Sequence, residues 1–452
     1  MKTVRIYRLG MLSSSLFQRL KAAQMEAAQV WNECMETHKQ ARVAHTLWPG
    51  RTELQKATKG RFALHSQSVQ MIEHAFLATI LATRELRKSH PHMRMKYPWR
   101  TKRFYPVMWP AQAVSKERGR VVLPMGKGRK SLILPLSLPE HSGACTLVWK
   151  NGFELHVCIE IPQAEDAPGE NKASVDLGEI HLAAVTTNTG KAMIVTGRGI
   201  RSLKRQRTMR LRKITQKQAH CKKYSRRWKK LQRAKNKTCH RSERRIRDMR
   251  HKATRQVINF CVENEVGSLF IGNPHGVRTR DNGRHHNQRM ALWEYGKDID
   301  YLTHKAKAAH ILSFTGSERG TSSQCPRCEH KHKPEGRVWR CKQCGFIGHR
   351  DLVGSINMHR LAYGSQVEFP RSFTYLRPGP SRSSRRADTP QRCLSESTGQ
   401  PLHEVQVPLG TGHTVEIAQK PVSRSRRREC HAKPSRCMAV LCEMRSRMPT
   451  MM

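Results

Sequence analysis

GTSSQCPRCEHKHKPEGRVWRCKQCGFIGHRDLVGSINM, residues 320–358, carries the most specific pattern in this sequence. Two C-x2-C pairs are separated by twelve residues, a spacing that lets four thiolates converge tetrahedrally on one zinc ion. The alternative is a set of reduced cysteines with a redox role. Because a closed four-thiolate site has no open coordination position, we predict a structural zinc and look for the chemistry at Asp351, the nearest acidic candidate. The predicted zinc ligands are Cys325, Cys328, Cys341 and Cys344.

The chain is strongly basic, with 84 Lys and Arg against 34 Asp and Glu and a formal net charge of +50 in 452 residues. This excess predicts binding to a polyphosphate backbone, with a membrane surface or a histone-like packing role as alternatives. The longest apolar run, residues 75–82, is too short to span a bilayer, so no membrane contact is expected. Without a secretory pattern at the N-terminus, and with cysteines placed as metal ligands and free thiols, a reducing cytoplasm is expected.

The first part of the chain predicts two kinds of structure. Short apolar runs between Gly, Pro and charged turns indicate a β-rich domain in residues 1–12 and 91–165, and apolar residues at helical intervals indicate a helical lobe in residues 13–90. Residues 96–109, KYPWRTKRFYPVMW, interleave aromatic and basic side chains. That pattern suits stacking on unpaired bases, although the aromatics could equally form a core. The candidate nucleic-acid contacts here are Tyr97, Trp99, Arg100, Lys102 and Arg103.

A second domain is predicted over residues 172–363. Its first strand carries Asp176 among apolar residues, where an aspartate is costly unless it is paired or bound to a metal, so it is either structural or functional. A basic helical pair over residues 201–264 is long enough to follow a duplex or heteroduplex, with a solvated face as the plainer alternative. Residues 364–452 are rich in Ser, Arg and Pro and predict a disordered basic tail. The candidate contacts of the helical pair are Arg226, Arg227, Lys229, Lys230 and Arg250.

The order of these features resembles the TnpB/OrfB proteins of bacterial insertion sequences, over about residues 1 to 363. The resemblance rests on SVDLG around Asp176, on the CPRC and CKQC pairs, and on HRDLVGSINM around Asp351 and Asn357. It implies an α/β multidomain protein: a RuvC-like nuclease domain of RNase H fold with an inserted zinc ribbon at 321–348. A β-barrel wedge domain with an inserted helical recognition lobe would precede it. The family also implies relatedness to type V CRISPR effectors.

The resemblance implies a Mg²⁺-dependent DNA endonuclease, guided by an RNA from the transposon end, that cuts double-stranded DNA in the bacterial, nucleoid-associated cytoplasm. A RuvC-like site holds two Mg²⁺ ions with three carboxylates, because Mg²⁺ prefers hard oxygen ligands. Asp176 and Asp351 match the first and the third. The second should be a Glu after the strand near residue 270, but Gly272 and Asn273 stand there.

Two explanations of that departure compete. In the first, Glu294 in a helix over residues 291–306 supplies the missing charge as a catalytic metal ligand, and in the second the nuclease is inactive. We favour Glu294. Three functions therefore remain: an RNA-guided endonuclease of a mobile element, a nuclease-inactive RNA-guided DNA-binding protein, and a general zinc-ribbon nucleic-acid-binding protein.

Overall fold

The computed structural model describes residues 1–117, 119–277, 281–332, 336–364 and 367–379. The chain divides into two compact units, one ending at Ile161 and the other beginning at Pro162. Each unit has its own buried core. Most of the predicted basic tail, from residue 380 onward, lies outside the described residues.

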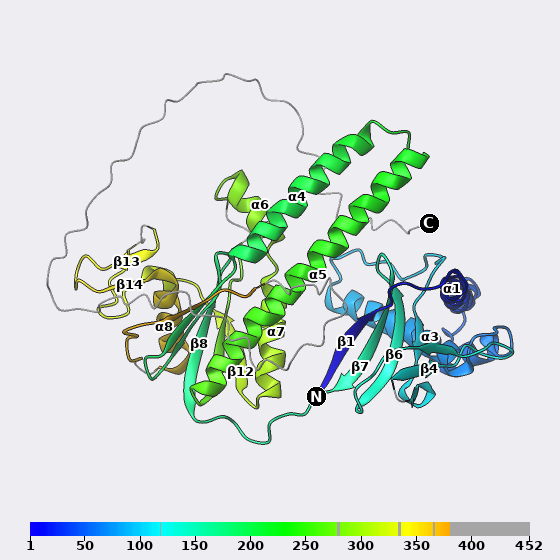
Figure 1. Cartoon of the computed structure of the whole chain (residues 1–452), viewed down its shortest axis with the longest axis horizontal. Coiled ribbons are helices and arrows are strands. Elements are labelled where there is room, and N and C mark those ends of the chain that lie inside the picture. The colour runs from blue at the N-terminus through cyan, green and yellow to red at the C-terminus, as the bar shows by residue number, and fades with distance from the viewer. Residues whose placement is uncertain (118, 278–280, 333–335, 365–366, 380–452) are drawn as a thin grey trace, which may run out of the picture. The chain divides into compact units, whose positions relative to one another are not determined.

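The first unit combines three helices with two antiparallel sheets (Figure 1). The larger sheet has the order β1-β7-β6-β2, so the first strand of the chain pairs with the last strand of this unit. Helices α1 and α3 pack together and contribute Leu20, Trp31 and Phe76 to the same core as the strands. The bounds are β1 Lys2–Arg8, α1 Ser14–Val43, α2 Arg51–Thr58, α3 Ser66–Ser89, β2 Val107–Trp109, β3 Ser115–Glu117, β4 Arg120–Leu123, β5 Leu132–Leu134, β6 Ser142–Trp149 and β7 Phe153–Glu160.

The second unit is built on a six-stranded mixed sheet of order β12-β11-β8-β9-β10-β15. Strands β8, β11 and β12 are mutually parallel, so their carboxyl ends lie at the same edge of the sheet. The bounds are β8 Asn171–Leu177, β9 His181–Thr187, β10 Ala192–Thr196, α4 Arg198–Ala219, α5 Arg226–Glu263, β11 Val266–Asn273, α6 Arg284–Leu292, α7 Tyr295–Ala308, β12 Leu312–Ser317, β13 Val338–Arg340, β14 Ile347–His349, α8 Arg350–Tyr363 and β15 Thr374–Leu376.

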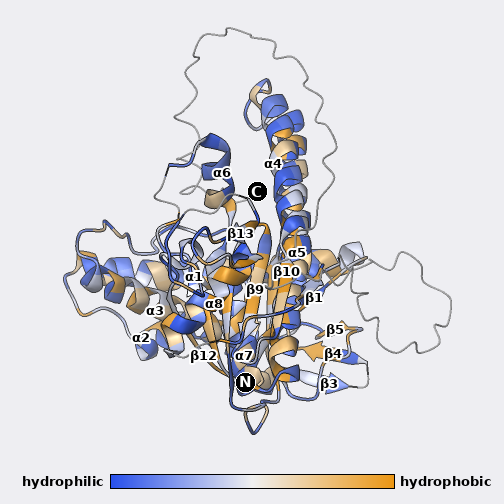
Figure 2. Ribbon diagram, turned by 90° about the vertical axis from the view of Figure 1, so that its left-hand side faces the viewer, coloured by the Kyte–Doolittle hydropathy of each residue, from blue (hydrophilic) through white to orange (hydrophobic). Residues whose placement is uncertain are grey.

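Helices cover both faces of this sheet. Because side chains alternate along a strand, Ala173 and Val175 of β8 join the core formed with α5 and α7, whereas Ser174 faces α8. Ser174 Oγ donates a hydrogen bond of 2.7 Å to the carbonyl oxygen of Ser355 in α8. Asp176 shares the face of Ser174, so the alternation directs its carboxylate toward α8. Figure 2 shows the hydrophobic colouring of β9 and β10 and the hydrophilic colouring along most of α4.

The cysteine segment leads directly into α8. Strands β13 and β14 form a small antiparallel hairpin, and α8 begins at Arg350, immediately after β14 ends at His349. Asn357 Nδ2 on α8 donates hydrogen bonds of 2.7 Å and 2.8 Å to the carbonyl oxygens of Thr321 and Gln324, just before the first cysteine. The hairpin and these bonds therefore fix the start of α8, where Asp351 lies.

Two expectations about the second unit need correction. The single helix predicted over 291–306 is broken at Trp293, between α6 and α7, where the backbone is extended (ψ 139°) and the side chain is buried in the core of the unit. Glu294 consequently lies at the break, one residue before α7, and not within a helix. The tail predicted from residue 364 is also partly ordered, since β15 pairs with β10 in parallel.

Candidate active site

Asp176 lies near the carboxyl end of β8, against the first turns of α8. A Cβ atom on Gly354 would lie only 2.5 Å from Asp176 Oδ2, so glycine at this position makes room for the carboxylate. Burial, followed by the nearby charges of Glu318 and Asp351, raises the pKa of Asp176 well above its usual range, although Arg350 acts in the opposite direction. Asp176 is therefore the centre of a group of converging acids.

Glu318 is the acid that the sequence reasoning missed. It follows β12 directly, and β12 pairs in parallel with β11, with Gly316 opposite Gly272. A Cβ atom on Gly272 would lie 3.1 Å from Glu318 Oε2 and 2.5 Å from the sulfur of Met358. The Glu318 carboxylate thus lies beside the position from which a glutamate on β11 would project. The signal was an acidic residue directly after a strand that neighbours β11.

Within the described ranges, no ion pair or hydrogen bond compensates the Glu318 carboxylate. Its Oε2 atom is buried and accepts no hydrogen bond among the described residues. Burial raises the pKa of Glu318 to about 7. A buried carboxylate beside two others is unfavourable unless a cation joins the group or a proton neutralises it. The three acids are charged neighbours with the oxygen ligands that divalent cations prefer, but they are not among the groups of described residues whose ligand atoms lie within 4.8 Å of one another.

Asp351 occupies the first turn of α8. Its backbone N–H donates to Nδ1 of His349 at 3.3 Å, which caps the helix, and its Oδ2 lies 2.5 Å from Nδ1 of His181. Arg337 Nη1 lies 3.2 Å from the same oxygen. Burial acts to raise the pKa of Asp351, but the hydrogen bond and charge of His181, together with His349 and Arg337, leave it below its usual range.

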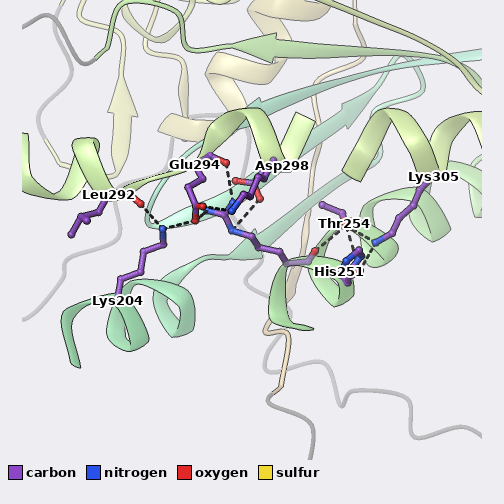
Figure 3. Close-up of polar contacts among 9 residues, drawn as sticks. Lys204, His251, Thr254, Leu292, Glu294, Asp298 and Lys305 are labelled. Carbon is purple, nitrogen blue, oxygen red and sulfur yellow. Dashed lines mark hydrogen bonds and ion pairs between the residues drawn. The ribbon is translucent and has the colours of Figure 1, made fainter. Parts of the chain in front are cut away.

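Glu294 lies among cations, as Figure 3 shows. Its Oε2 is 3.0 Å from Nζ of Lys204 and 3.8 Å from Nη2 of Arg250, and its Oε1 pairs with Lys297. Burial would raise its pKa, but these cations lower it to about 2. The acids that act on Asp176 are Glu318 and Asp351. The assignment of Glu294 as a metal ligand stays a prediction, and its carboxylate already has three partners.

The four predicted zinc ligands come together. Their sulfur atoms lie within 4.8 Å of one another, with 3.6 Å between Cys325 and Cys344 and 3.5 Å between Cys328 and Cys341. Zinc–sulfur bonds of about 2.3 Å in a tetrahedron put the sulfurs about 3.8 Å apart, whereas a disulfide needs about 2.0 Å. The cluster can therefore hold a metal ion such as zinc.

Comparison with known proteins gives matches in the second unit and at its boundary. The model of the family described as a probable transposase, OrfB_IS605, matches residues 156–278, and the model of the Cas12f1-like TNB domain matches residues 295–358. A TnpB-like protein of Methanocaldococcus jannaschii is 27% identical over 124 residues, which are 26% of this chain and 44% of that protein. The two family models and this relative together support a TnpB-type protein. The resemblance inferred from the sequence is thereby confirmed.

A solved structure extends the likeness of this TnpB-type chain to its fold. The protein of a Cas12f1-sgRNA-target DNA complex aligns over 76% of this chain and 82% of its own, with a TM-score of 0.53 and 12% sequence identity. At this identity the likeness concerns the fold alone. None of the helices in the described ranges is long and apolar enough to cross a membrane.

The predicted nucleic-acid contacts fall into different environments in the first unit. Tyr97 and Trp99 stack on each other with ring centroids 5.5 Å apart, and Arg42 lies 4.6 Å above the Trp99 ring. Lys102 lies over the buried ring of Trp31. These side chains are half-buried against the unit's core, whereas Arg100 and Arg103 are exposed. The stacking role of the two aromatics stays a prediction.

The basic residues of α5 also differ from one another. Four of them line its first turns with exposed side chains. Arg250 requires a correction, because its side chain is 1% exposed and its Nε lies 3.5 Å from Oδ1 of the equally buried Asp298. Its guanidinium is therefore held inside the protein and does not lie on a surface for nucleic acid. The exposed residues are Arg226, Arg227, Lys229 and Lys230.

Proposed function

We propose that this chain is an RNA-guided, Mg²⁺-dependent DNA endonuclease of a mobile element, with Asp176, Glu318 and Asp351 as its metal-binding carboxylates. In this proposal the second unit is a RuvC-like nuclease domain, and the first is a wedge domain with a helical recognition lobe. The partners are a guide RNA from the transposon end and a double-stranded DNA target. The aligned part of the archaeal relative is less than half of that protein, so these partners are inferred from family resemblance.

One observation carries the proposal: Oε2 of Glu318 is buried without a hydrogen-bond partner among the described residues, beside Gly272, and the Glu318 charge is close enough to Asp176 to raise its pKa. In this proposal Glu318, which follows β12, replaces the glutamate expected after β11, because β12 is the parallel neighbour of β11. It favours an active site over the nuclease-inactive alternative, because an inactive protein gains nothing from a buried Glu318 oxygen without a partner beside the buried Asp176.

The chain's own residues do the positioning. Gly354 leaves space for Asp176, Gly272 leaves space for Glu318, and His181 with Arg337 holds the Asp351 carboxylate at the start of α8. The cysteine hairpin, through its junction with α8, fixes where that helix begins. Two bound Mg²⁺ ions would activate the attacking water and stabilise the leaving oxygen of a phosphodiester. The exposed basic start of α5 would hold the phosphate backbone.

Cleavage of target DNA by the purified RNA complex tests this function. We expect Mg²⁺-dependent cleavage by the wild type, a loss of about 100-fold or more in Glu318→Gln, and near wild-type cleavage in Glu294→Gln. Glu263→Gln, which changes an exposed glutamate at the end of α5, serves as the matched control. Full activity in Glu318→Gln would refute the role of Glu318, and an inactive wild type would support the DNA-binding alternative.

A further inference from the structure

A second group of potential metal ligands adjoins the acidic residues. One ligand atom each from His181, His349 and Asp351 lies within 4.8 Å of the others. The two imidazole rings have centroids 5.2 Å apart, and Nδ1 of His181 is 2.5 Å from Oδ2 of Asp351. His349 and Asp351 lie two residues apart, where β14 ends and α8 begins, and the fold brings His181 to them from the start of β9.

The chemistry of these ligands differs from that of the three carboxylates. Mg²⁺ prefers oxygen ligands and keeps several waters, whereas imidazole nitrogen suits zinc, copper, iron or nickel better than it suits magnesium. Two imidazoles and one carboxylate also leave coordination positions open, as in the sites that hold redox-inert or redox-active divalent transition metals. A nitrogen-containing ligand set beside an oxygen-only one therefore selects a different ion.

We propose that His181, His349 and Asp351 form a binding site for a divalent transition-metal ion, for which Mn²⁺ serves as a paramagnetic probe. The site shares Asp351 with the carboxylates of the proposed nuclease, and only that sharing rests on the proposed function. Ion binding itself needs neither RNA nor DNA. In a nuclease with this site, one of the two metal positions prefers a transition metal to Mg²⁺.

The simpler role of these histidines is to hold Asp351 by hydrogen bonds. Arg337 already pairs with that carboxylate at 3.2 Å, and the 3.3 Å cap to His349 is a long hydrogen bond. Binding a metal through Nδ1 of His349 would exchange that weak cap for a coordinate bond. The two roles differ in one measurable property: only a metal site places imidazole nitrogen directly on a bound ion.

Pulsed electron paramagnetic resonance of Mn²⁺ bound to the full-length, zinc-loaded chain makes this distinction. We expect one Mn²⁺ per chain to remain bound in excess Mg²⁺ and to show nitrogen couplings from imidazole. His181→Asn and His349→Asn should each weaken that binding by about tenfold or more and remove the couplings, whereas the exposed His285→Asn should change neither. Zinc content and thermal unfolding of each variant show whether it is folded.

Bound Mn²⁺ without nitrogen coupling in the wild type would overturn the proposal, and so would unchanged binding in both histidine variants. Both results can be read without any cleavage assay. Failure of the proposed function would give a different result: the wild type would show no Mg²⁺-dependent cleavage, or Glu318→Gln would cleave DNA at the wild-type rate.

Discussion

Two acidic regions of the second unit differ in how their charges are compensated. In the first, which we call the convergent acids, Asp176, Glu318 and Asp351 meet at the carboxyl edge of the sheet, and Glu318 has a buried oxygen without a partner among the described residues. In the second, the paired acids, Glu294 contacts Lys204 and Lys297, and Asp298 lies 3.5 Å from Arg250, which opposes but does not overcome the burial that raises the pKa of Asp298 to about 7. The convergent acids carry excess negative charge, which a bound cation would compensate. The paired acids are next to protein cations, and their ion pairs connect neighbouring helices.

The largest effect is expected when the carboxylate of Glu318, after β12, is removed and a new one is placed at position 272 of β11. Glu318→Gly should reduce the cleavage rate by about 1000-fold. The double variant Glu318→Gly/Gly272→Glu should cleave at least about tenfold faster than Glu318→Gly alone. The reason is that a Cβ atom at position 272 would lie 3.1 Å from Glu318 Oε2, once the Met358 sulfur, 2.5 Å from that Cβ, has moved aside. Cleavage rates of the single and double variants measure the effect. A double variant no better than Glu318→Gly would show that the two positions do not share one metal site.

Replacing Arg250, the buried cation of the second cluster, tests the role of the paired acids. Arg250→Met should lower the free energy of unfolding by about 3 kcal/mol, because it leaves the buried Asp298 without its partner. Chemical denaturation followed by circular dichroism measures the loss. Arg245→Met, an exposed change on the same helix, is the matched control. The folded fraction of Arg250→Met should still cleave DNA, and a selective loss of catalysis would contradict a structural role for this cluster.

Neutralising one acid in each cluster should change stability in opposite directions. Without divalent metal, Glu318→Gln should raise the free energy of unfolding by about 1 kcal/mol, since it removes repulsion among the convergent acids. Glu294→Gln should lower it by roughly 0.5 to 1 kcal/mol, because ion pairs of a side chain that is 38% exposed are screened by solvent. Thermal unfolding in chelator-treated buffer measures both. Equal signs would remove the contrast between the clusters.

The smallest effect concerns Lys305, which donates to Oγ1 of Thr254 at 2.6 Å near the paired acids (Figure 3). Burial, and then the charge of Arg255, lowers the pKa of Lys305 to about 7. Between that value and its unfolded value of about 10.4, the unfolded chain binds more protons, so this group makes stability rise with pH. Denaturation from pH 7 to 10 should show a steeper rise for the wild type than for Lys305→Met. If the unfolding free energies of the wild type and Lys305→Met change in parallel with pH, the lowered pKa of Lys305 is contradicted.

The sequence predicted those parts of the site that depend on local patterns. The cysteine spacing identified four ligands that the structure gathers, and the motifs around Asp176 and Asp351 identified two acids that lie close together. Glu318 escaped because its relation to Gly272 arises from the parallel register of β11 and β12, which no local pattern encodes. Glu294 was favoured because two intact aspartates argued for an active site, but the helix expected to carry it is broken at Trp293, where the backbone extends.

The environment of basic and aromatic side chains was equally hard to predict. Arg250 has the same charge as the exposed arginines of α5, and only the position of Asp298 on α7 shows that it is buried. Tyr97 and Trp99 suit base stacking by type, yet they also stack on each other against the core of the first unit. Residue type alone did not separate these roles, because burial depends on contacts between distant segments.

Stabilisation by Mg²⁺ tests most directly whether Glu318 completes the carboxylate site, because it needs no RNA, DNA or cleavage. An ion that binds only the folded chain raises the melting temperature in proportion to the logarithm of its excess over the dissociation constant. We predict that Mg²⁺ raises the melting temperature of the wild type and of Glu294→Gln alike, and that Glu318→Gln loses most of this rise. A rise that survives in Glu318→Gln and disappears in Glu294→Gln would contradict the account.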